Sequence, residues 1–292
     1  MEVIVVDDKS TEPAEEIVTS YGYIYIRLER NSGQATARNE GARSAIGDVL
    51  FFIDSDVALR KDTIAKVAAA HTRDDVFIYQ GIPAKTSLNG GFGPSLLSLK
   101  MYYMLKDCRQ SSYIHSHLFS INKNVFDEIG GFDPCFRPPG CGEEFELGHR
   151  LRNRHIIHTN PELVADQKGV SVLSRAYVLY HRAFAWARLF TETRRFEKTN
   201  ASFGEAISGF FAAGAVACLV GATYIPFMLA LSVLFLVCQL LSCWGFYCFL
   251  VKERGVFFML RAIFPNMLWL LAATAGGTIS ILSFSGKRHG TH

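Results

Sequence analysis

The strongest constraint on the fold is an 80-residue stretch near the C-terminus that is almost free of charge. Between Ala206 and Ser285 the only charged residues are Lys252, Glu253, Arg254 and Arg261. The other 212 positions hold 53 of the 57 charged residues, about 25%, which is average for a soluble domain. The sequence therefore predicts a globular part followed by a lipid-facing part, and it excludes a wholly soluble or wholly disordered protein.

Three apolar segments reach the roughly 20 residues that a helix needs to cross a bilayer. They run approximately over Ile207–Tyr224, Pro226–Val251 and Ile263–Phe284. The first two are joined so closely that they predict a hairpin. The basic residues between the second and third segments mark that connection as cytoplasmic by the positive-inside rule. A third crossing would break the same rule at Lys287 and Arg288, so the last segment is either a third span or a re-entrant or interfacial segment.

A basic, aromatic stretch over residues 172–198 precedes these segments. Helices of this composition commonly lie in the membrane interface. The alternative is a helix that packs on the globular domain with a solvated basic side. We divide the chain accordingly into a globular domain (1–170), an interfacial helix region (171–205), a transmembrane region with two to three spans (206–285) and a tail (286–292).

The globular part alternates short apolar runs with helical stretches. The predicted strands are Val3–Val6, Tyr23–Leu28, Val49–Ile53 and Val76–Tyr79, and the predicted helices are Pro13–Ser20, Gln34–Ile46, Asp62–His71 and Ser95–Asp107. This βαβ rhythm is typical of an α/β fold, with a mostly parallel, Rossmann-like sheet and helices on both faces.

Carboxylates stand where ligands bind in such folds, just after the strands. Asp54-Ser55-Asp56 directly follows Val49–Ile53, at the carboxyl end of a predicted parallel strand. Carboxylates there can hold a hard divalent cation that also binds phosphate. The competing interpretation is a helix N-cap ahead of Asp62.

Three further polar clusters accompany this triplet. Asp7 and Asp8 follow the first strand, and Arg38 lies in a glycine-flanked helix start where it can meet a phosphate or a base. The alternative for each of these two clusters is an ordinary turn with caps. Glu143 and Glu144 open another helix. They are either partners of the helix dipole or, for a carboxylate placed over a cleft, a general base.

The order of the motifs VIVVDDKST, GQATARNEG, DVLFFIDSD, EIGGFDP and GEEFELGHRLR resembles glycosyltransferase family 2, the nucleotide-sugar transferases of GT-A fold. The similarity covers about residues 2–170, and the C-terminal spans resemble the membrane-anchored branch. The resemblance implies a nucleobase contact at Asp8, a nucleotide-site role for Arg38, ribose and phosphate contacts at Asp54 and a metal ligand at Asp56. The catalytic base would come from the pair Glu143-Glu144, with Glu144 as the base.

The resemblance implies an inverting transfer of sugar from a nucleotide-sugar donor to a lipid-linked or polysaccharide acceptor, with Mg²⁺ or Mn²⁺ as cofactor. We expect a multi-pass protein of the cell membrane with its catalytic domain in the cytoplasm and no nucleic-acid partner, since the net charge of +3 is small and dispersed. The alternatives are a nucleotidyltransferase and a non-catalytic membrane scaffold.

The chain departs from the family pattern in three places. Glu143-Glu144 replaces the usual Glu-Asp, which makes the expected base one methylene longer. Asp166-Gln167 stands where related sequences often carry a histidine. The family's first strand and helix are expected ahead of Met1, so we interpret the globular domain as N-terminally truncated.

Overall fold

The computed structural model describes residues 1–135, 142–193 and 203–287, with no side chains described at 184–186, 188–193, 203 and 284–287. The chain divides into two compact units. The first comprises Met1–Pro83 and Asp107–Gln167, and the second comprises Ala84–Lys106 and Lys168–His292. The end of the predicted basic helix, after Thr193, and the predicted tail beyond Lys287 lie outside the described residues.

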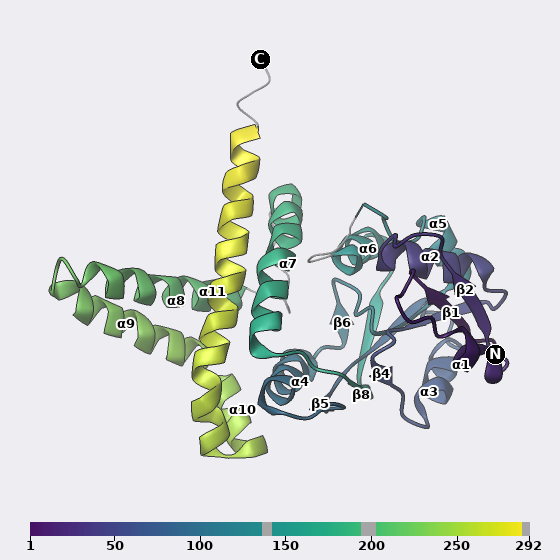
Figure 1. The fold of residues 1–292 in the computed structure, drawn as a ribbon, viewed down its shortest axis with the longest axis horizontal. Helices are drawn as coiled ribbons and strands as arrows, with labels where there is room; N and C mark the ends of the chain where they lie inside the picture. The colour runs from purple at the N-terminus through teal and green to yellow at the C-terminus, as the bar shows by residue number, and fades with distance from the viewer. Residues whose placement is uncertain (136–141, 194–202, 288–292) are drawn as a thin grey trace. The chain divides into compact units, whose positions relative to one another are not determined.

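The first unit is built on two sheets (Figure 1). Strands β1 (Ile4–Asp7) and β2 (Ile24–Arg27) form a parallel pair with Ile4 opposite Ile24. The larger sheet has the order β3-β7-β5-β8-β4, with β6 beside β8. Its strands are β3 (Val49–Ile53), β4 (Val57–Ala58), β5 (Ile78–Ser87), β6 (Gln110–Ser111), β7 (Leu118–Asn122) and β8 (Ile157–Gln167).

Helices cover both faces of the larger sheet because neighbouring residues of β7 point to opposite sides. Phe119 packs in a cluster with residues of α2, α5 and α6, whereas Leu118 packs in a second cluster with Val67 of α3. The helices of this unit are α1 (Glu15–Ser20), α2 (Gln34–Ser44), α3 (Thr63–Ala70), α5 (Lys123–Glu128) and α6 (Glu143–Leu151). The two clusters make the layered α/β core that the sequence predicts.

The strand directions are mixed. The β1–β2 pair is parallel, as the βαβ rhythm predicts, but β7 pairs antiparallel with both β3 and β5, and β8 pairs antiparallel with β4 and β6. The rhythm of short strands and helices holds only as far as residue 70; the later strands follow longer and less regular connections, which allow a strand to enter in either direction.

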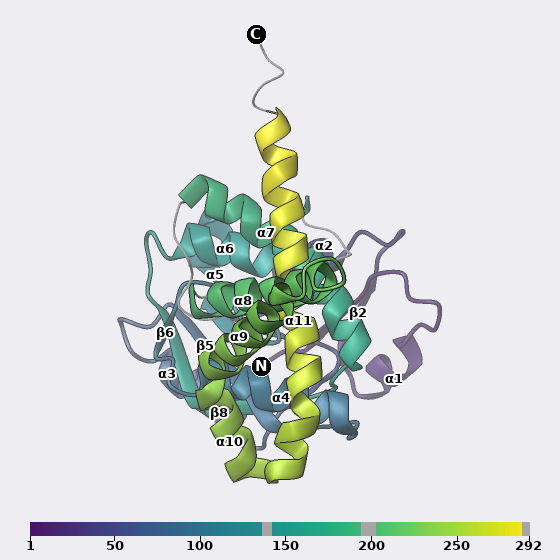
Figure 2. The same cartoon turned by 90° about the vertical axis from the view of Figure 1, so that its left-hand side faces the viewer.

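Apart from the end of β5, the regular elements described in the second unit are helices. They are α4 (Phe92–Leu105), α7 (Val172–Thr193), α8 (Phe203–Gly221), α9 (Phe227–Ser242), α10 (Trp244–Arg254) and α11 (Val256–Lys287). A buried cluster centred on Leu99, Leu250 and Trp269 joins α4, α10 and α11. Helices α8 and α9 form the predicted hairpin, which projects away from α11 in Figure 1 and points towards the viewer in Figure 2.

The second predicted span, Pro226–Val251, is broken. Helices α9 and α10 meet at Cys243 with a bend of 61°. Gly245 lies just beyond the bend, where a Cβ atom would come within 2.5 Å of the Tyr103 hydroxyl of α4. The bend thus allows α10 to pack closely on α4, a tertiary contact that hydropathy does not reveal.

Two helical segments of the described chain are long and apolar enough to cross a membrane, Gly204–Gly221 and Val256–Ser283. The number rises to three if the bent pair α9–α10 is one span. The C-terminal part therefore has the composition of a membrane-associated region.

Candidate active site

The site lies in the first unit, at the carboxyl ends of β1 and β3 and the N-termini of α2 and α6. Its centre is the guanidinium of Arg38, whose side chain is only 13% exposed. One terminal nitrogen lies 2.7 Å from Asp54 Oδ1 and the other lies 2.7 Å from Glu143 Oε1. The ring of Phe132 stacks beneath it, 5.4 Å from the guanidinium carbon. Arg38 thus joins the end of β3 to the start of α6.

Two opposed effects act on the pKa of Arg38. Burial lowers it, and the charges of Asp54 and Glu143 raise it more, so that it lies above the ordinary value for arginine. The guanidinium is therefore a permanent cation. It offers five N–H donors in all, and the two carboxylates leave others for a further anion.

Glu143 is fully buried and its carboxylate accepts several hydrogen bonds. Gln34 and Arg38, one turn apart on α2, both donate to Oε1. Oε2 accepts from the backbone N–H of Gly142, which has a φ of +113° and caps α6. This carboxylate is positioned to hold Arg38. Glu144, the next residue, is 4% exposed, and its backbone carbonyl accepts from the N–H of Ile114.

Asp54 and Asp56 lie in the turn that follows β3, where Asp54 accepts from the N–H of Val57 through its backbone carbonyl. The Asp54 side chain is 33% exposed, and Asp56 is exposed. No cluster of three histidine, cysteine, aspartate or glutamate side chains suited to a metal occurs in the described part of the chain. Two accessible carboxylates fit Mg²⁺ or Mn²⁺ nonetheless, because such ions take one or two protein carboxylates and fill their shell with phosphate and water.

Asp8, predicted to contact a nucleobase, holds the start of α2. Its two carboxylate oxygens accept from the backbone N–H groups of Ser32, at 2.6 Å, and Gly33, at 2.8 Å. Gly33 has a φ of +89°, a conformation that favours glycine. Asp8 thereby fixes the helix that carries Arg38.

Asp7, buried at the end of β1, is held as firmly. The hydroxyl of Tyr25 donates to it at 2.5 Å and the N–H of Ser10 at 2.7 Å. The hydrogen bond from Tyr25 is the main reason why the pKa of Asp7 falls to about 2. The carboxylate is therefore ionised at neutral pH, and its contribution to stability is lost only as the pH falls below about 4 towards 2.

Three residues that hold the site together are not among the site residues predicted from the sequence: Gln34, Asn39 and Arg150. Asn39 donates to the carbonyl of Phe132 and accepts from its N–H, while Arg150 donates to the carbonyl of Gly131. These bonds hold the Gly-Gly-Phe-Asp turn against α2, through Asn39, and against α6, through Arg150. The helical spacing of Gln34 and Arg38, four residues apart, was a signal for the first of them.

Residues 1–130 match the model of the family described as Glycosyl transferase family 2. An uncharacterized glycosyltransferase of Bacillus subtilis, YfnE, is 35% identical over 85 residues, which are 28% of this chain and 22% of that protein. An uncharacterized glycosyltransferase of Haemophilus influenzae is 32% identical over 150 residues, covering 47% of this chain and 48% of its own length. The chain thus matches less than half of each of these relatives.

Among solved structures, the mannosyltransferase PcManGT from Pyrobaculum calidifontis, in complex with GDP-Man and Mn²⁺, matches 95% of this chain and 77% of its own length. The TM-score is 0.52 at 15% sequence identity. The likeness confirms the GT-A fold that the motifs imply.

Proposed function

We propose, from the match of residues 1–130 to the glycosyltransferase family 2 model, that the chain moves a sugar from a nucleotide-sugar donor to an acceptor at the membrane face. The observation that carries the proposal is Arg38 between Asp54 and Glu143, 2.7 Å from each, at the strand ends. This arrangement places the Arg38 guanidinium and the Asp54–Asp56 turn at the same edge of the sheet. A nucleoside diphosphate can bind there, because its phosphates pair with a guanidinium.

Asp56, with Asp54, is the proposed holder of Mg²⁺ or Mn²⁺. The bound ion would offset the charge on the diphosphate of the donor. The presence of Mn²⁺ with GDP-Man in PcManGT supports a divalent ion in this role. Asp8 acts through the start of α2 and keeps Arg38 in place beside the nucleotide.

The proposed reaction is a single displacement that inverts the anomeric carbon. The acceptor hydroxyl oxygen forms the new bond to that carbon, and its proton passes to the carboxylate of Glu144. The bond between the anomeric carbon and the β-phosphate oxygen breaks, which releases a nucleoside diphosphate. Glu143 is a positioning residue in this scheme, because its oxygens are already bonded to Gln34, Arg38 and Gly142.

The acceptor is proposed to be lipid-linked, and the helices of the second unit support this. We expect the full chain, reconstituted in vesicles, to glycosylate a polyprenyl-linked glycan at least tenfold faster than the same glycan without its polyprenyl chain. NMR of the product should show an inverted anomeric configuration.

Equal rates on the two acceptors would contradict the proposal of a lipid-linked acceptor. They would mean that the second unit only anchors the enzyme to the membrane. A retained anomeric configuration would contradict the single displacement.

A further inference from the structure

The apolar helices of the second unit differ in what surrounds them. Helices α8 and α9 pack on one another along their length: Ser232 donates to the carbonyl of Ala215, and the ring of Phe235 lies against Gly214. Large apolar residues cover the rest of the hairpin surface and are exposed: Phe210, Leu219, Val220, Phe227, Leu229, Val233, Leu234 and Leu241. No charged residue occurs from Ala206 to Val251.

The long helix α11, in contrast, packs against charged neighbours. It runs beside α7, where Trp269 donates to the carbonyl of Val172 at 2.9 Å and Gly276 lies against the carbonyl of Tyr180. Arg175 and Arg182 lie on this stretch of α7 or just beyond it. If α11 enters a membrane, these arginines therefore enter it to a similar depth.

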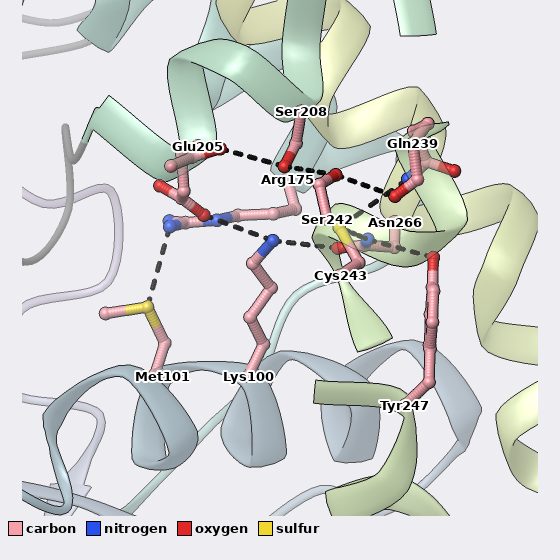
Figure 3. A network of polar contacts seen from close by, with 11 residues as sticks. Lys100, Met101, Arg175, Glu205, Ser208, Gln239, Ser242, Cys243, Tyr247 and Asn266 are labelled. Atoms are coloured by element: carbon pink, nitrogen blue, oxygen red, sulfur yellow. Dashed lines mark hydrogen bonds and ion pairs between the residues drawn. The ribbon is translucent and has the colours of Figure 1, made fainter. Parts of the chain in front are cut away.

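Polar side chains meet at the middle of α11 (Figure 3). The ammonium of Lys100 on α4 lies 2.7 Å from Asn266 Oδ1 and 3.3 Å from Glu205. Asn266 is fully buried and donates to Tyr247. The apolar segment of α11 runs over Val256–Ser283, so Asn266 is about one turn from its centre.

A crossing by α11 would place Lys100, Asn266 and Arg175 near the middle of the bilayer, where charged groups are costly. A helix that lies along the surface avoids this cost. Most of the exposed large apolar side chains described on α11 form a stripe: Phe257, Leu260, Phe264, Ile279 and Leu282. Val256 and Ile281 are also exposed but lie outside it. At 3.6 residues per turn the stripe lies on a different face of α11 from Trp269 and Gly276, which contact α7. The hairpin leaves on the side away from α7 (Figure 1).

We propose that the α8–α9 hairpin is the membrane-inserted element and that α11 lies along the bilayer surface with its stripe on the lipid. Sixteen residues of α8, from Ala206 to Gly221, extend about 24 Å. That length brings the tip at Tyr224 close to the far headgroups of a core about 30 Å thick. Trp244, exposed at the base of the hairpin, lies at the near headgroups, where tryptophan is enriched.

Depth measurements test this arrangement. Single nitroxide labels at Leu260, Phe264, Ile279 and Leu282, in a variant whose native cysteines are replaced, are read in vesicles of phosphatidylcholine and phosphatidylglycerol. The 22 helical steps from Leu260 to Leu282 rise about 33 Å. A surface helix keeps all four labels at one shallow depth, about 5–10 Å below the headgroups. Labels at Val220 and Leu241 are the matched controls on the hairpin and should differ strongly in depth.

The proposal would be overturned if the label depths changed from one side of the bilayer centre to the other between Leu260 and Leu282. So would labels exposed to water, or labels shielded from both lipid and water, which would mean that another protein chain covers the stripe. A reporter fused to the C-terminus of the unaltered chain gives an independent reading. It should lie on the same side as a reporter inserted after Val251, and the opposite side would mean that α11 crosses. Neither measurement requires a sugar donor, so each holds whether or not the proposed function does.

Discussion

Replacing Asp56 with asparagine is expected to lower the turnover of sugar transfer by about 10³-fold or more while leaving the fold intact. The side chain is exposed at the end of β3, and asparagine keeps its size and shape while removing its charge. Removal of its charge weakens the hold on a cation whose effect on the leaving diphosphate is worth several kcal/mol, and each 1.4 kcal/mol is a factor of ten in rate.

The matched control is Asp75→Asn, which removes an exposed carboxylate paired with Arg73 elsewhere in the same unit. It should keep full turnover. Circular dichroism of both variants checks the fold, and a titration with Mn²⁺ measures metal affinity. If Asp56→Asn kept wild-type turnover in the presence of a chelator, the proposed metal-binding role of Asp56 would be contradicted.

Substitutions in the pair Glu143-Glu144 are expected to have the second large effect on activity. The two substitutions should change different properties of the enzyme. Glu144→Gln should reduce kcat with a hydroxyl acceptor by about 10²- to 10⁴-fold, the usual range for loss of a general base, with donor affinity unchanged. Glu143→Gln should weaken donor binding and stability instead, by about 1–3 kcal/mol, because it removes a buried charge from beside Arg38.

Kinetics and chemical denaturation of the two variants separate these roles. A loss of kcat alone in Glu144→Gln and a loss of stability and affinity in Glu143→Gln agree with a base and a positioning residue. Similar losses in both would assign the whole pair to structure.

Much of the local structure could be predicted because it depends on neighbouring residues. The β-branched and aromatic run Val49–Ile53 is β3, with the same bounds. Helix α2 begins at Gln34, as expected from the glycine before it, and the Asp54–Asp56 turn stands after its strand. Periodicity and turn residues are sufficient for such elements.

Long-range contacts could not be predicted from the same patterns. The bond from Arg38 to Glu143 joins residues 105 positions apart, and it gives a first-turn glutamate a buried role that sequence alone leaves open. The grouping of Ala84–Lys106 with the C-terminal helices is a second case. The many apolar residues of α4 indicate that the helix is buried, but not that α10 and α11 cover it.

The most direct test of the central claim is the identity of the phosphate product. The full chain, reconstituted in vesicles with Mn²⁺ and a polyprenyl-linked acceptor, is supplied in turn with UDP-sugars and GDP-sugars, and the products are separated by chromatography. The account predicts a nucleoside diphosphate in equal amount to the glycosylated acceptor. A nucleoside monophosphate or pyrophosphate as the product would indicate a different transfer reaction, and no turnover with any donor would contradict the proposed function.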